Sequence, residues 1–380
     1  MCYESMYTPL RTLRGHRQCV WDVAATNDYI YSAGWDGKVL EWDANNGNMC
    51  RDFKGHDGQV WSVDVDVKNE VLLTAGEDRT VRVWAAAQGE ASEEGGAYGK
   101  CLGTIEGTHE SPVYFVKSIS TSNEAIVCVT GSQDGSIKQW TVDRAEGFQS
   151  KSTTLASCHD GGVTCAARND AAKLLATSGS DTCIKVFSYG GAGGGLELFL
   201  KIGEERNADL GHNAAVSSLA FGTAGGSGSG DASPTSTNPN LLLSGSWDGN
   251  ARLWDIRAPA AERCASSWGA HRQNVSGVAF YGDTVCMTAS SDDQDGLKVW
   301  DLRRLQKVFK ASKKGEKRYV SIEPLQAMDN HINTVCQLTS LPNGSQIVSA
   351  SSDRTLIQWY ANVPPLEKKP TGKVACCTVS

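Results

Sequence analysis

The sequence has no run of about 18 apolar residues, the length that marks a membrane-spanning helix, so we expect no transmembrane segment. Residues 1–5 lack the basic start and apolar core of a secretory signal, so we expect no export by that route. Proline is scarce, with 10 among 380 residues, whereas glycine is abundant at 40. This composition favours a turn-rich β protein over a helical bundle.

Excess positive charge and paired cysteine motifs are also missing. The net charge is −7, which argues against general nucleic-acid binding. The 13 cysteines are scattered, and no two C-x-x-C motifs have zinc-site spacing. We interpret them as reduced, mostly buried thiols of a cytoplasmic protein. No G-x-x-x-x-G-K-[ST] phosphate loop occurs, so the glycine runs at 190–195 and 225–230 are interpreted as loops.

The sequence does contain a sevenfold repeat. Each of its histidines is followed four residues later by valine, and the histidines are His16, His56, His109, His159, His212, His271 and His331. Each valine leads to a Ser/Thr, an Asp four residues on, and an aromatic residue beyond it. The sets are Ser32/Asp36/Trp42, Thr74/Asp78/Trp84, Thr130/Asp134/Trp140, Thr177/Asp181/Phe187, Ser244/Asp248/Trp254, Thr288/Asp292/Trp300 and Ser349/Asp353/Trp359.

These repeats resemble the WD-repeat family, whose repeats begin with Gly-His, as at Gly15-His16, and end with Trp-Asp, as at Trp254-Asp255. The resemblance implies an all-β, seven-bladed β-propeller with four strands in each blade. It further implies a hydrogen-bonded chain of His, Ser/Thr, Trp and Asp within a blade. We expect a propeller over residues 1–360, a flexible tail over 361–380, and an N-terminal strand that closes the last blade.

Two repeats depart from the family pattern. Phe187 replaces the indole donor of the fourth repeat, so we expect its hydrogen-bonded chain to be broken. The sixth repeat has a longer turn, in which Asp295 competes with Asp292 for the network position. Three insertions, at 87–100, 222–240 and 303–318, are expected to emerge on the face opposite the histidine loops.

The repeats account for every histidine, so none is left for a catalytic triad or a histidine metal site. The repeated aspartates are interpreted as turn residues rather than acid–base groups. We therefore expect no enzymatic activity, no metal, no cofactor and no small-molecule substrate. The expected partners are proteins.

Aromatic residues on the histidine-loop side are the candidate protein-binding residues. The resemblance places them at the rim of the central channel, and they are Trp21, Trp35, Trp61, Tyr114 and Trp247. Trp and Tyr are typical hot-spot residues of interfaces. Packing between blades is the alternative interpretation for each of them. Trp268 lies three residues before its histidine, as Leu13 and Phe53 do before theirs, so we expect it in the core instead.

The C-terminal residues Cys377-Thr378-Val379-Ser380 fit a C-a-a-X prenylation box, and a final Ser favours farnesyl. A single prenyl chain binds membranes weakly, so a second signal is expected. Cys376 offers a palmitoylation site. Basic side chains that an anionic membrane would attract are Lys368, Lys369 and Lys373 in the tail and Lys310, Lys313, Lys314, Lys317 and Arg318 in the third insertion. A disordered tail with a chance cysteine is the alternative.

Two segments, Trp254-Asp255-Ile256-Arg257 and Trp300-Asp301-Leu302-Arg303, resemble the W-D-x-R box of WD-repeat substrate receptors. Such receptors dock on the adaptor of cullin-RING ubiquitin ligases, which would make Asp255, Arg257, Asp301 and Arg303 the adaptor-binding residues. An ordinary blade ending is the competing interpretation. The sequence thus predicts a scaffold on the cytosolic face of a membrane. A ubiquitin-ligase receptor and a soluble subunit of an assembly remain the alternatives.

Overall fold

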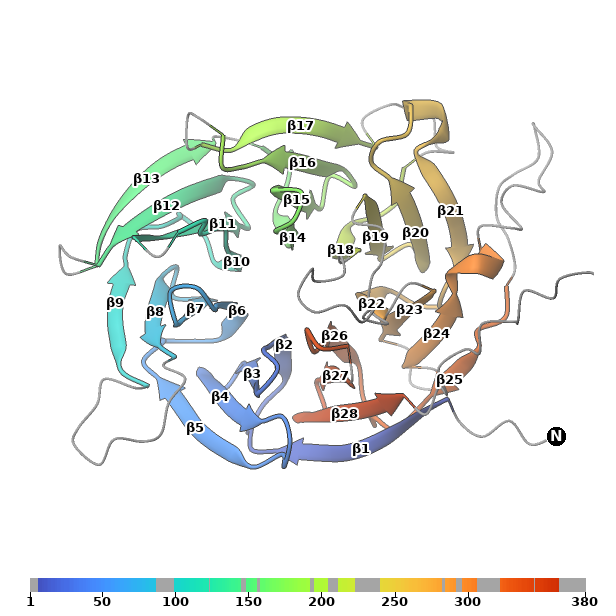
Figure 1. Ribbon diagram of the computed structural model, residues 1–380, viewed down its shortest axis with the longest axis horizontal. Helices are drawn as coiled ribbons and strands as arrows, with labels where there is room; N and C mark the ends of the chain where they lie inside the picture. Colours follow the sequence, from blue (N-terminus) through green and yellow to red (C-terminus); the bar gives the residue numbers. More distant parts are fainter. Residues whose placement is uncertain are drawn as a thin grey trace, which may run out of the picture.

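The protein is described from a computed structural model, which covers residues 6–86, 99–122, 124–144, 148–155, 158–191, 195–203, 211–222, 240–281, 284–291, 296–305, 322–344 and 346–361. Seven four-stranded antiparallel sheets are arranged as blades around a central axis (Figure 1). The prediction of a seven-bladed β-propeller is therefore confirmed.

The first four blades take their strands in sequence order. Blade 1 contains β2 (Val20–Ala25), β3 (Tyr29–Gly34), β4 (Lys38–Asp43) and β5 (Met49–Lys54). Blade 2 contains β6 (Val60–Asp66), β7 (Val71–Gly76), β8 (Val81–Ala85) and β9 (Cys101–Ile105). Blade 3 contains β10 (Val113–Ser118), β11 (Ala125–Ser132), β12 (Ile137–Asp143) and β13 (Gln149–Leu155). Blade 4 contains β14 (Val163–Asn169), β15 (Leu174–Gly179), β16 (Ile184–Ser188) and β17 (Glu197–Ile202).

The remaining blades include the one that closes the ring. Blade 5 contains β18 (Val216–Phe221), β19 (Leu241–Ser246), β20 (Asn250–Asp255) and β21 (Cys264–Gly269), with a short 3₁₀ helix η1 (Ala260–Glu262) before β21. Blade 6 contains β22 (Val275–Tyr281), β23 (Val285–Ser290), β24 (Leu297–Asp301) and β25 (Gln326–Met328). Blade 7 contains β26 (Val335–Ser340), β27 (Gln346–Ser351), β28 (Thr355–Ala361) and, as its outer strand, β1 (Tyr7–Arg14).

The N-terminal strand closes the ring, as predicted from the sequence. Strand β1 pairs antiparallel with β28, from Tyr7 opposite Ala361 to Arg14 opposite Thr355 (Figure 1). The Gln326 side chain also bonds both backbone groups of Tyr7, at 3.0 and 2.9 Å, and so joins blade 6 to the same strand. The first and last strands of the chain are thus held in one sheet.

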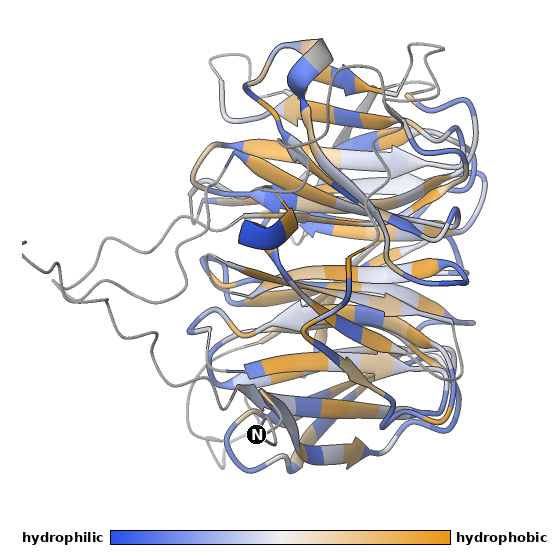
Figure 2. Ribbon diagram, turned by 90° about the vertical axis from the view of Figure 1, so that its right-hand side faces the viewer, coloured by the Kyte–Doolittle hydropathy of each residue, from blue (hydrophilic) through white to orange (hydrophobic). Residues whose placement is uncertain are grey.

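The core lies between blades rather than inside any single one. Val20, Leu40 and Trp42 of blade 1, for example, form one buried cluster with Val348 and Leu356 of blade 7. Such faces can be buried only by stacking neighbours, which is why the repeats fold as a ring. Figure 2 shows apolar segments along the stacked strands and hydrophilic residues at many of the turns.

The insertions interrupt the blades at the positions expected from the repeats. They separate β8 from β9, β18 from β19, and β24 from β25. Because neighbouring strands are antiparallel, these three connections belong to the face opposite the histidine loops. Their residues 87–98, 223–239 and 306–321 lie outside the described residues. No helix within the described ranges is long and apolar enough to cross a membrane.

Candidate partner-binding face

A chain of side-chain hydrogen bonds fixes the histidine loop of each blade. In blade 1, the indole N–H of Trp42 donates to Ser32 Oγ at 2.9 Å, and the same oxygen lies 2.9 Å from His16 Nε2. The other ring nitrogen, Nδ1, lies 3.0 Å from an Asp36 oxygen. Since Asp36 can only accept, Nδ1 carries the proton and Nε2 accepts from the serine hydroxyl.

The same links recur around the ring. Histidine Nε2 lies 2.7–3.0 Å from a Ser or Thr hydroxyl in all seven blades. An indole N–H reaches that hydroxyl at 2.8–3.0 Å in six blades. The aspartate also accepts backbone N–H groups, as Asp36 does from Arg17 and Lys38. Each of the six described network aspartates thereby joins two loops, which stiffens this face.

Departures from the pattern are smaller than the sequence suggested. Phe187 provides no indole donor, yet His159 keeps its bonds to Thr177 at 3.0 Å and to Asp181 at 2.9 Å. The chain of blade 4 is therefore broken at its aromatic link, as expected, while its histidine bonds remain because they do not depend on the aromatic residue. In blade 6, Asp292 and Asp295 lie outside the described residues, so their competition stays a prediction.

In the third blade, a serine relays the bond between histidine and aspartate. His109 Nδ1 lies 2.8 Å from Ser136 Oγ, whose hydroxyl donates to Asp134 at 2.6 Å. The direct distance from Nδ1 to Asp134 is 3.4 Å. Burial lowers the pKa of His109 to about 4, and the charge of Asp134 offsets this only in part. His109 is therefore neutral near pH 7.

The network aspartates stay ionised. Burial raises the pKa of Asp353, but the hydrogen bonds from His331 and Thr355 outweigh it and hold that pKa well below the usual range. Asp36, Asp78, Asp181 and Asp248 have pKa values lowered in the same way against the effect of burial. Because these carboxylates are already used by the blades, they are structural groups.

A β-bulge places one side chain of every blade at the inner end of the histidine-loop face. The register between the first and second strands skips the residue after the first valine, and these residues are Trp21, Trp61, Tyr114, Thr164, Ser217, Ser276 and Cys336. Bulges reorient side chains and are frequent at barrel rims. The seven residues therefore form a ring around the axis.

In blades 1 to 3, the bulge residues belong to one aromatic cluster, made of Trp21, Trp35, Trp61 and Tyr114. Trp21 stacks on Trp35 with ring centroids 5.2 Å apart, and Trp61 lies 5.0 Å from Trp21 and 5.4 Å from Trp35. Tyr114 extends the cluster, 5.3 Å from Trp61. Trp21 is 37% exposed, and the others are partly buried. The structure thus brings four of the five candidate aromatic residues together.

Two indole donors inside the cluster are unsatisfied. Nε1 of Trp35 and Nε1 of Trp61 are shielded from solvent and have no hydrogen-bond partner among the described residues. An unpaired buried donor costs free energy, about 1–3 kcal/mol.

In blades 4 to 6, the bulge residues are hydroxyl side chains that hydrogen-bond to the next blade. The hydroxyls of Thr164, Ser217 and Ser276 donate to the valine carbonyl that begins the next blade. Cys336 of blade 7 instead contacts Cys19 beside the first strand of blade 1.

Trp247 is 54% exposed in blade 5 and stands apart from the aromatic cluster in the described ring contacts. Trp268 is buried, as expected.

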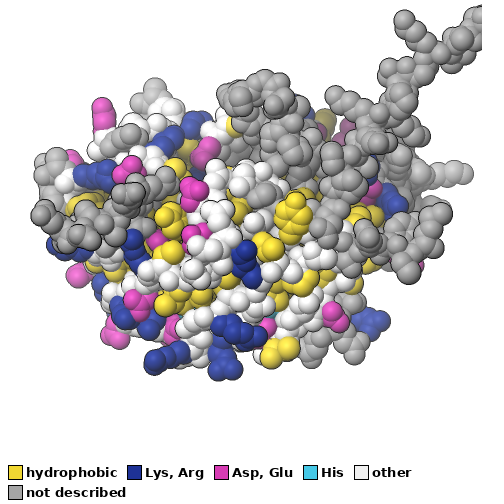
Figure 3. Space-filling model, turned by 60° about the horizontal axis from the view of Figure 1, so that its bottom comes forward, with side chains coloured by type: hydrophobic (Ala, Val, Ile, Leu, Met, Phe, Trp, Pro, Cys, Tyr) yellow, Lys and Arg dark blue, Asp and Glu magenta, His cyan; other side chains and the backbone are white. Residues whose placement is uncertain are grey.

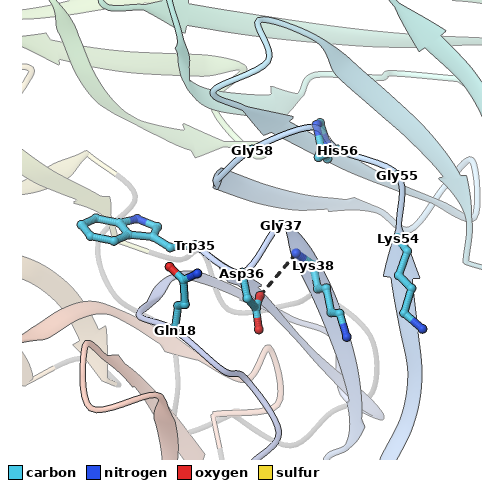
Figure 4. Close-up of a pocket in the computed structure, with 9 residues that line it drawn as sticks. All are labelled: Gln18, Trp35, Asp36, Gly37, Lys38, Lys54, Gly55, His56 and Gly58. Carbon is cyan, nitrogen blue, oxygen red and sulfur yellow. Dashed lines mark hydrogen bonds between the residues drawn. The ribbon is translucent and has the colours of Figure 1, made fainter.

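A pocket of about 330 Å³ adjoins the aromatic cluster between blades 1 and 2. Trp35 and Gln18 line one side, whereas Lys38 and Lys54 extend side by side on the other (Figure 4). Asp52 lies 2.6 Å from the Lys54 ammonium and 3.8 Å from that of Lys38. The pocket therefore adds charged side chains to the edge of an apolar surface. No motif in the sequence marks this pocket, because its lining residues come from three separate segments of the chain.

The W-D-x-R segments form turns at the ends of their strands. Asp255 accepts the backbone N–H of Arg257 at 3.1 Å, and Asp301 accepts that of Arg303 at 2.9 Å. The Arg303 guanidinium also holds Asp301 through two bonds, at 3.0 and 2.9 Å. Asp43 of blade 1 accepts a backbone N–H in the same position without any arginine. The local role of these aspartates is thus to hold the turn that ends the third strand of the blade.

On the side of the ring shown in Figure 3, the described side chains do not form a field of one charge. In the view over the side where β1 and β5 lie, basic, acidic and apolar side chains are interspersed (Figure 3). The candidate lipidation residues Cys376 and Cys377 lie outside the described residues. So do the candidate basic residues Lys310, Lys313, Lys314, Lys317, Arg318, Lys368, Lys369 and Lys373. Their roles stay predictions.

Comparison with known proteins supports this architecture. The sequence model of the WD domain, G-beta repeat matches residues 7–43, 47–85, 99–141, 150–188, 205–255 and 322–360. The strands β22 to β24 of blade 6 fall between the last two matches, where the turn is enlarged and an insertion follows. Blade 6 is nevertheless a complete four-stranded sheet in the structure.

Among the similar proteins are two plant G-protein subunits and a ribosome biogenesis protein. The chain is 28% identical over 282 residues to a guanine nucleotide-binding protein subunit beta of Arabidopsis thaliana, covering 72% of this chain and 64% of that protein. The rice protein of the same name (Oryza sativa subsp. japonica) is 22% identical over 384 residues, 97% of this chain and 87% of its own. The ribosome biogenesis protein WDR12 homolog of Drosophila erecta is 27% identical over 240 residues, 60% of this chain and 50% of its own.

The chain thus spans just under two thirds of the Arabidopsis protein and half of the fly protein. The repeats and these relatives mark it as a protein-interaction scaffold. With more than half of its residues matched by the family's sequence model, and with all seven blades present in its fold, this chain belongs to the WD-repeat family.

Proposed function

We propose that this chain is a non-enzymatic scaffold that holds its protein partner at the aromatic cluster. The observation that carries the proposal is the contact of four aromatic rings across three blades, at 5.0–5.4 Å between centroids, three of them on bulges at the histidine-loop face. Clustered Trp and Tyr side chains near the centre of a surface are typical anchors of an interface. The rigid network beneath them lowers the entropy cost of binding.

The asymmetry of the bulge ring supports the same location. Blades 4 to 6 use hydroxyls that are satisfied within the ring, whereas blades 1 to 3 present aromatic rings. A partner that supplies a carbonyl acceptor would relieve the unpaired indole donors of Trp35 or Trp61. Trp247 is proposed as a separate contact for a partner that extends across the channel.

Affinity purification followed by mass spectrometry tests the proposal. Trp21→Ala and Trp35→Ala should each reduce partner recovery about tenfold or more, as for hot-spot residues. Phe199→Ala is the matched control, because Phe199 is an exposed aromatic residue on the outer strand of blade 4. Unchanged recovery in both tryptophan variants, with folding verified by circular dichroism, would contradict the proposal.

We further propose that the C-terminus tethers the scaffold to the cytosolic face of a membrane. The support is the terminal box at Cys377, with Cys376 and three nearby lysines as second signals. Each lysine near an anionic leaflet contributes about 1 kcal/mol. Without lipidation, the same propeller serves as a soluble subunit, a role that the names of the G-protein subunit relatives favour.

The direction of strand β28 bears on how the tethered propeller is oriented. It begins at Thr355, next to the histidine-loop turn of Asp353, and ends at Ala361 on the opposite face. The connection from β24 to β25 also belongs to that opposite face. The basic insertion and the lipidated tail would therefore both approach the membrane, with the aromatic cluster directed toward the cytosol.

The role of a ubiquitin-ligase substrate receptor is kept as an alternative proposal. It depends on the two W-D-x-R segments. Arg257 is 60% exposed at its side chain, and Arg303 is 54% exposed although bound to Asp301, so both reach the surface. Because Arg303 lies at the proposed membrane-proximal face, adaptor docking and membrane binding would compete.

A further inference from the structure

Cys19 and Cys336 come together at the seam where the ring closes. Their sulfur atoms lie 3.6 Å apart, although 317 positions separate them in the sequence. Cys336 is the bulge residue of β26 in blade 7, and Cys19 immediately precedes β2 in blade 1. Both residues are only 8% exposed. The contact therefore belongs to the interface between the last blade and the first.

In other blades, the bulge residue equivalent to Cys336 makes a contact with the next blade. In blades 4 to 6, the bulge residue donates a hydroxyl hydrogen bond to the next blade. In blade 7, two thiols meet at that place and form only a weak hydrogen bond. A disulfide has a sulfur–sulfur distance of about 2.05 Å, so the thiols need to approach by roughly 1.5 Å more.

We propose that Cys19 and Cys336 are an oxidation site that forms an intramolecular disulfide with hydrogen peroxide and so locks blade 1 to blade 7. One thiolate attacks a peroxide oxygen, the O–O bond breaks, and a sulfenic acid and hydroxide form. The second thiol then attacks the sulfenic sulfur, and water leaves as the S–S bond forms. Two thiols and one peroxide yield one disulfide and two waters, with two electrons passing from sulfur to oxygen.

The environment makes this oxidation slow and selective. The hydrogen bond that the Cys336 thiol shares with Cys19, followed by burial, raises the pKa of Cys336, and the reactive species is the thiolate. Short exposure to oxidant should therefore spare the pair, whereas an exposed thiol such as Cys50 reacts first. After the first oxidation, the neighbouring sulfur at contact distance captures the sulfenic acid before a second peroxide can reach it.

The crosslink has a specific mechanical consequence. The seam is already held at its outer edge by the pairing of β1 with β28. A Cys19–Cys336 disulfide would add a covalent bond at the inner edge, next to the axis. The backbone carbonyl of Cys19 accepts the backbone N–H of Trp35 at 2.9 Å, so one end of the crosslink would be bonded to a residue of the aromatic cluster. This inference does not depend on the proposed partner binding.

The test uses the full-length reduced protein, exposed to hydrogen peroxide for hours, alkylated, digested and analysed by mass spectrometry. We expect a peptide pair linked through Cys19 and Cys336, which dithiothreitol reverses, in protein that stays monomeric on a non-reducing gel. A closed loop of this length should shift the unfolding equilibrium in urea toward the folded state by about 30-fold or more.

Variants separate this pair from the other cysteines. Cys19→Ser and Cys336→Ser should each abolish the linked peptide and the urea shift, whereas the control Cys50→Ser should leave both unchanged. The wild-type protein alone can decide the question if a variant misfolds. Oxidation of Cys50 with Cys19 and Cys336 both recovered as free, alkylated thiols would overturn the proposal.

Discussion

In the fourth blade, the Thr177 hydroxyl lies 3.0 Å from Nε2 of His159, although Phe187 supplies no indole N–H to it. The aromatic link of the network is therefore separable from the histidine link. Elsewhere, as between Trp254 and Ser244 at 2.8 Å, both links are present. The seven blades thus share a histidine bond that positions the loop and differ in whether an aromatic donor reinforces it.

Substitutions at Trp254 should separate the hydrogen bond of this residue from its packing. Trp254→Phe removes the donor to buried Ser244, and we expect a loss of about 1–3 kcal/mol in the free energy of unfolding. Trp254→Ala also leaves a cavity, and we expect about 3–5 kcal/mol. Trp35→Ala should cost far less, since Trp35 is partly exposed. Urea titrations in which the Phe and Ala variants of Trp254 lose equal stability would contradict this division.

His109 should make the protein sensitive to mild acid. Its pKa is about 4 in the folded protein because burial disfavours the cation, whereas an unfolded histidine has a pKa near 6.5. The unfolded chain therefore binds a proton first, and stability falls as pH decreases from about 6.5 to 4, by up to about 3 kcal/mol. Below that window the histidine contributes no further change.

A His109→Asn variant should show a shallower loss of stability between pH 6.5 and 4. The network aspartates act in a lower window: their folded pKa values are lowered, so their contribution is present above about pH 3.8 and is lost as pH falls further. Denaturant midpoints measured at several pH values separate the two effects. Identical profiles for the variant and the wild type from pH 6.5 to 4 would assign the acid response to other groups.

Cys377→Ser should move the protein from membrane to soluble fractions, because it removes the thiol that accepts a prenyl group. Cys376→Ser should weaken retention only in part, since it removes a second signal and leaves the first. Fractionation of cells with active prenyltransferase measures both. A wild-type protein that is wholly soluble under these conditions would rule out the tether and leave the soluble subunit.

The basic insertion should strengthen binding of the lipidated protein to anionic liposomes. Replacing Lys310, Lys313, Lys314, Lys317 and Arg318 with Gln should reduce binding and flatten its dependence on salt. Liposomes of neutral lipid are the control, because on them the two proteins should bind alike. Equal binding to anionic liposomes would contradict the proposed orientation without bearing on lipidation.

Changing Arg257 and Arg303 to Ala tests the receptor alternative. If the chain binds a cullin adaptor, the double variant should lose the adaptor from a pull-down while it keeps partners held at the aromatic cluster. The aspartates are left in place, since Asp255 and Asp301 each accept a backbone hydrogen bond that shapes the strand end. A wild-type pull-down without adaptor removes this alternative.

The fold followed from the sequence because two spacings recur in all seven repeats: Val follows each histidine by four residues, and Asp follows each Ser/Thr by four. The clustering of Trp21 with Trp61 did not, since contacts between blades depend on the bulges and on the curvature of the ring. The meeting of Cys19 and Cys336 was equally hidden by their separation of 317 positions. The sequence also located the missing aromatic link at Phe187, but spacing does not reveal that the histidine bonds of that blade persist without it.

The pairing of β1 with β28 also has a consequence for how the protein is made on the ribosome. Tyr7 emerges early, but its partner Ala361 is translated about 350 residues later, a delay of roughly 20–70 s at 5–20 residues per second. During that interval the first strand has no partner strand, and the ring of blades cannot close. Nascent chains stalled before residue 355 should therefore engage chaperones, and the finished propeller forms only after synthesis has passed its last strand.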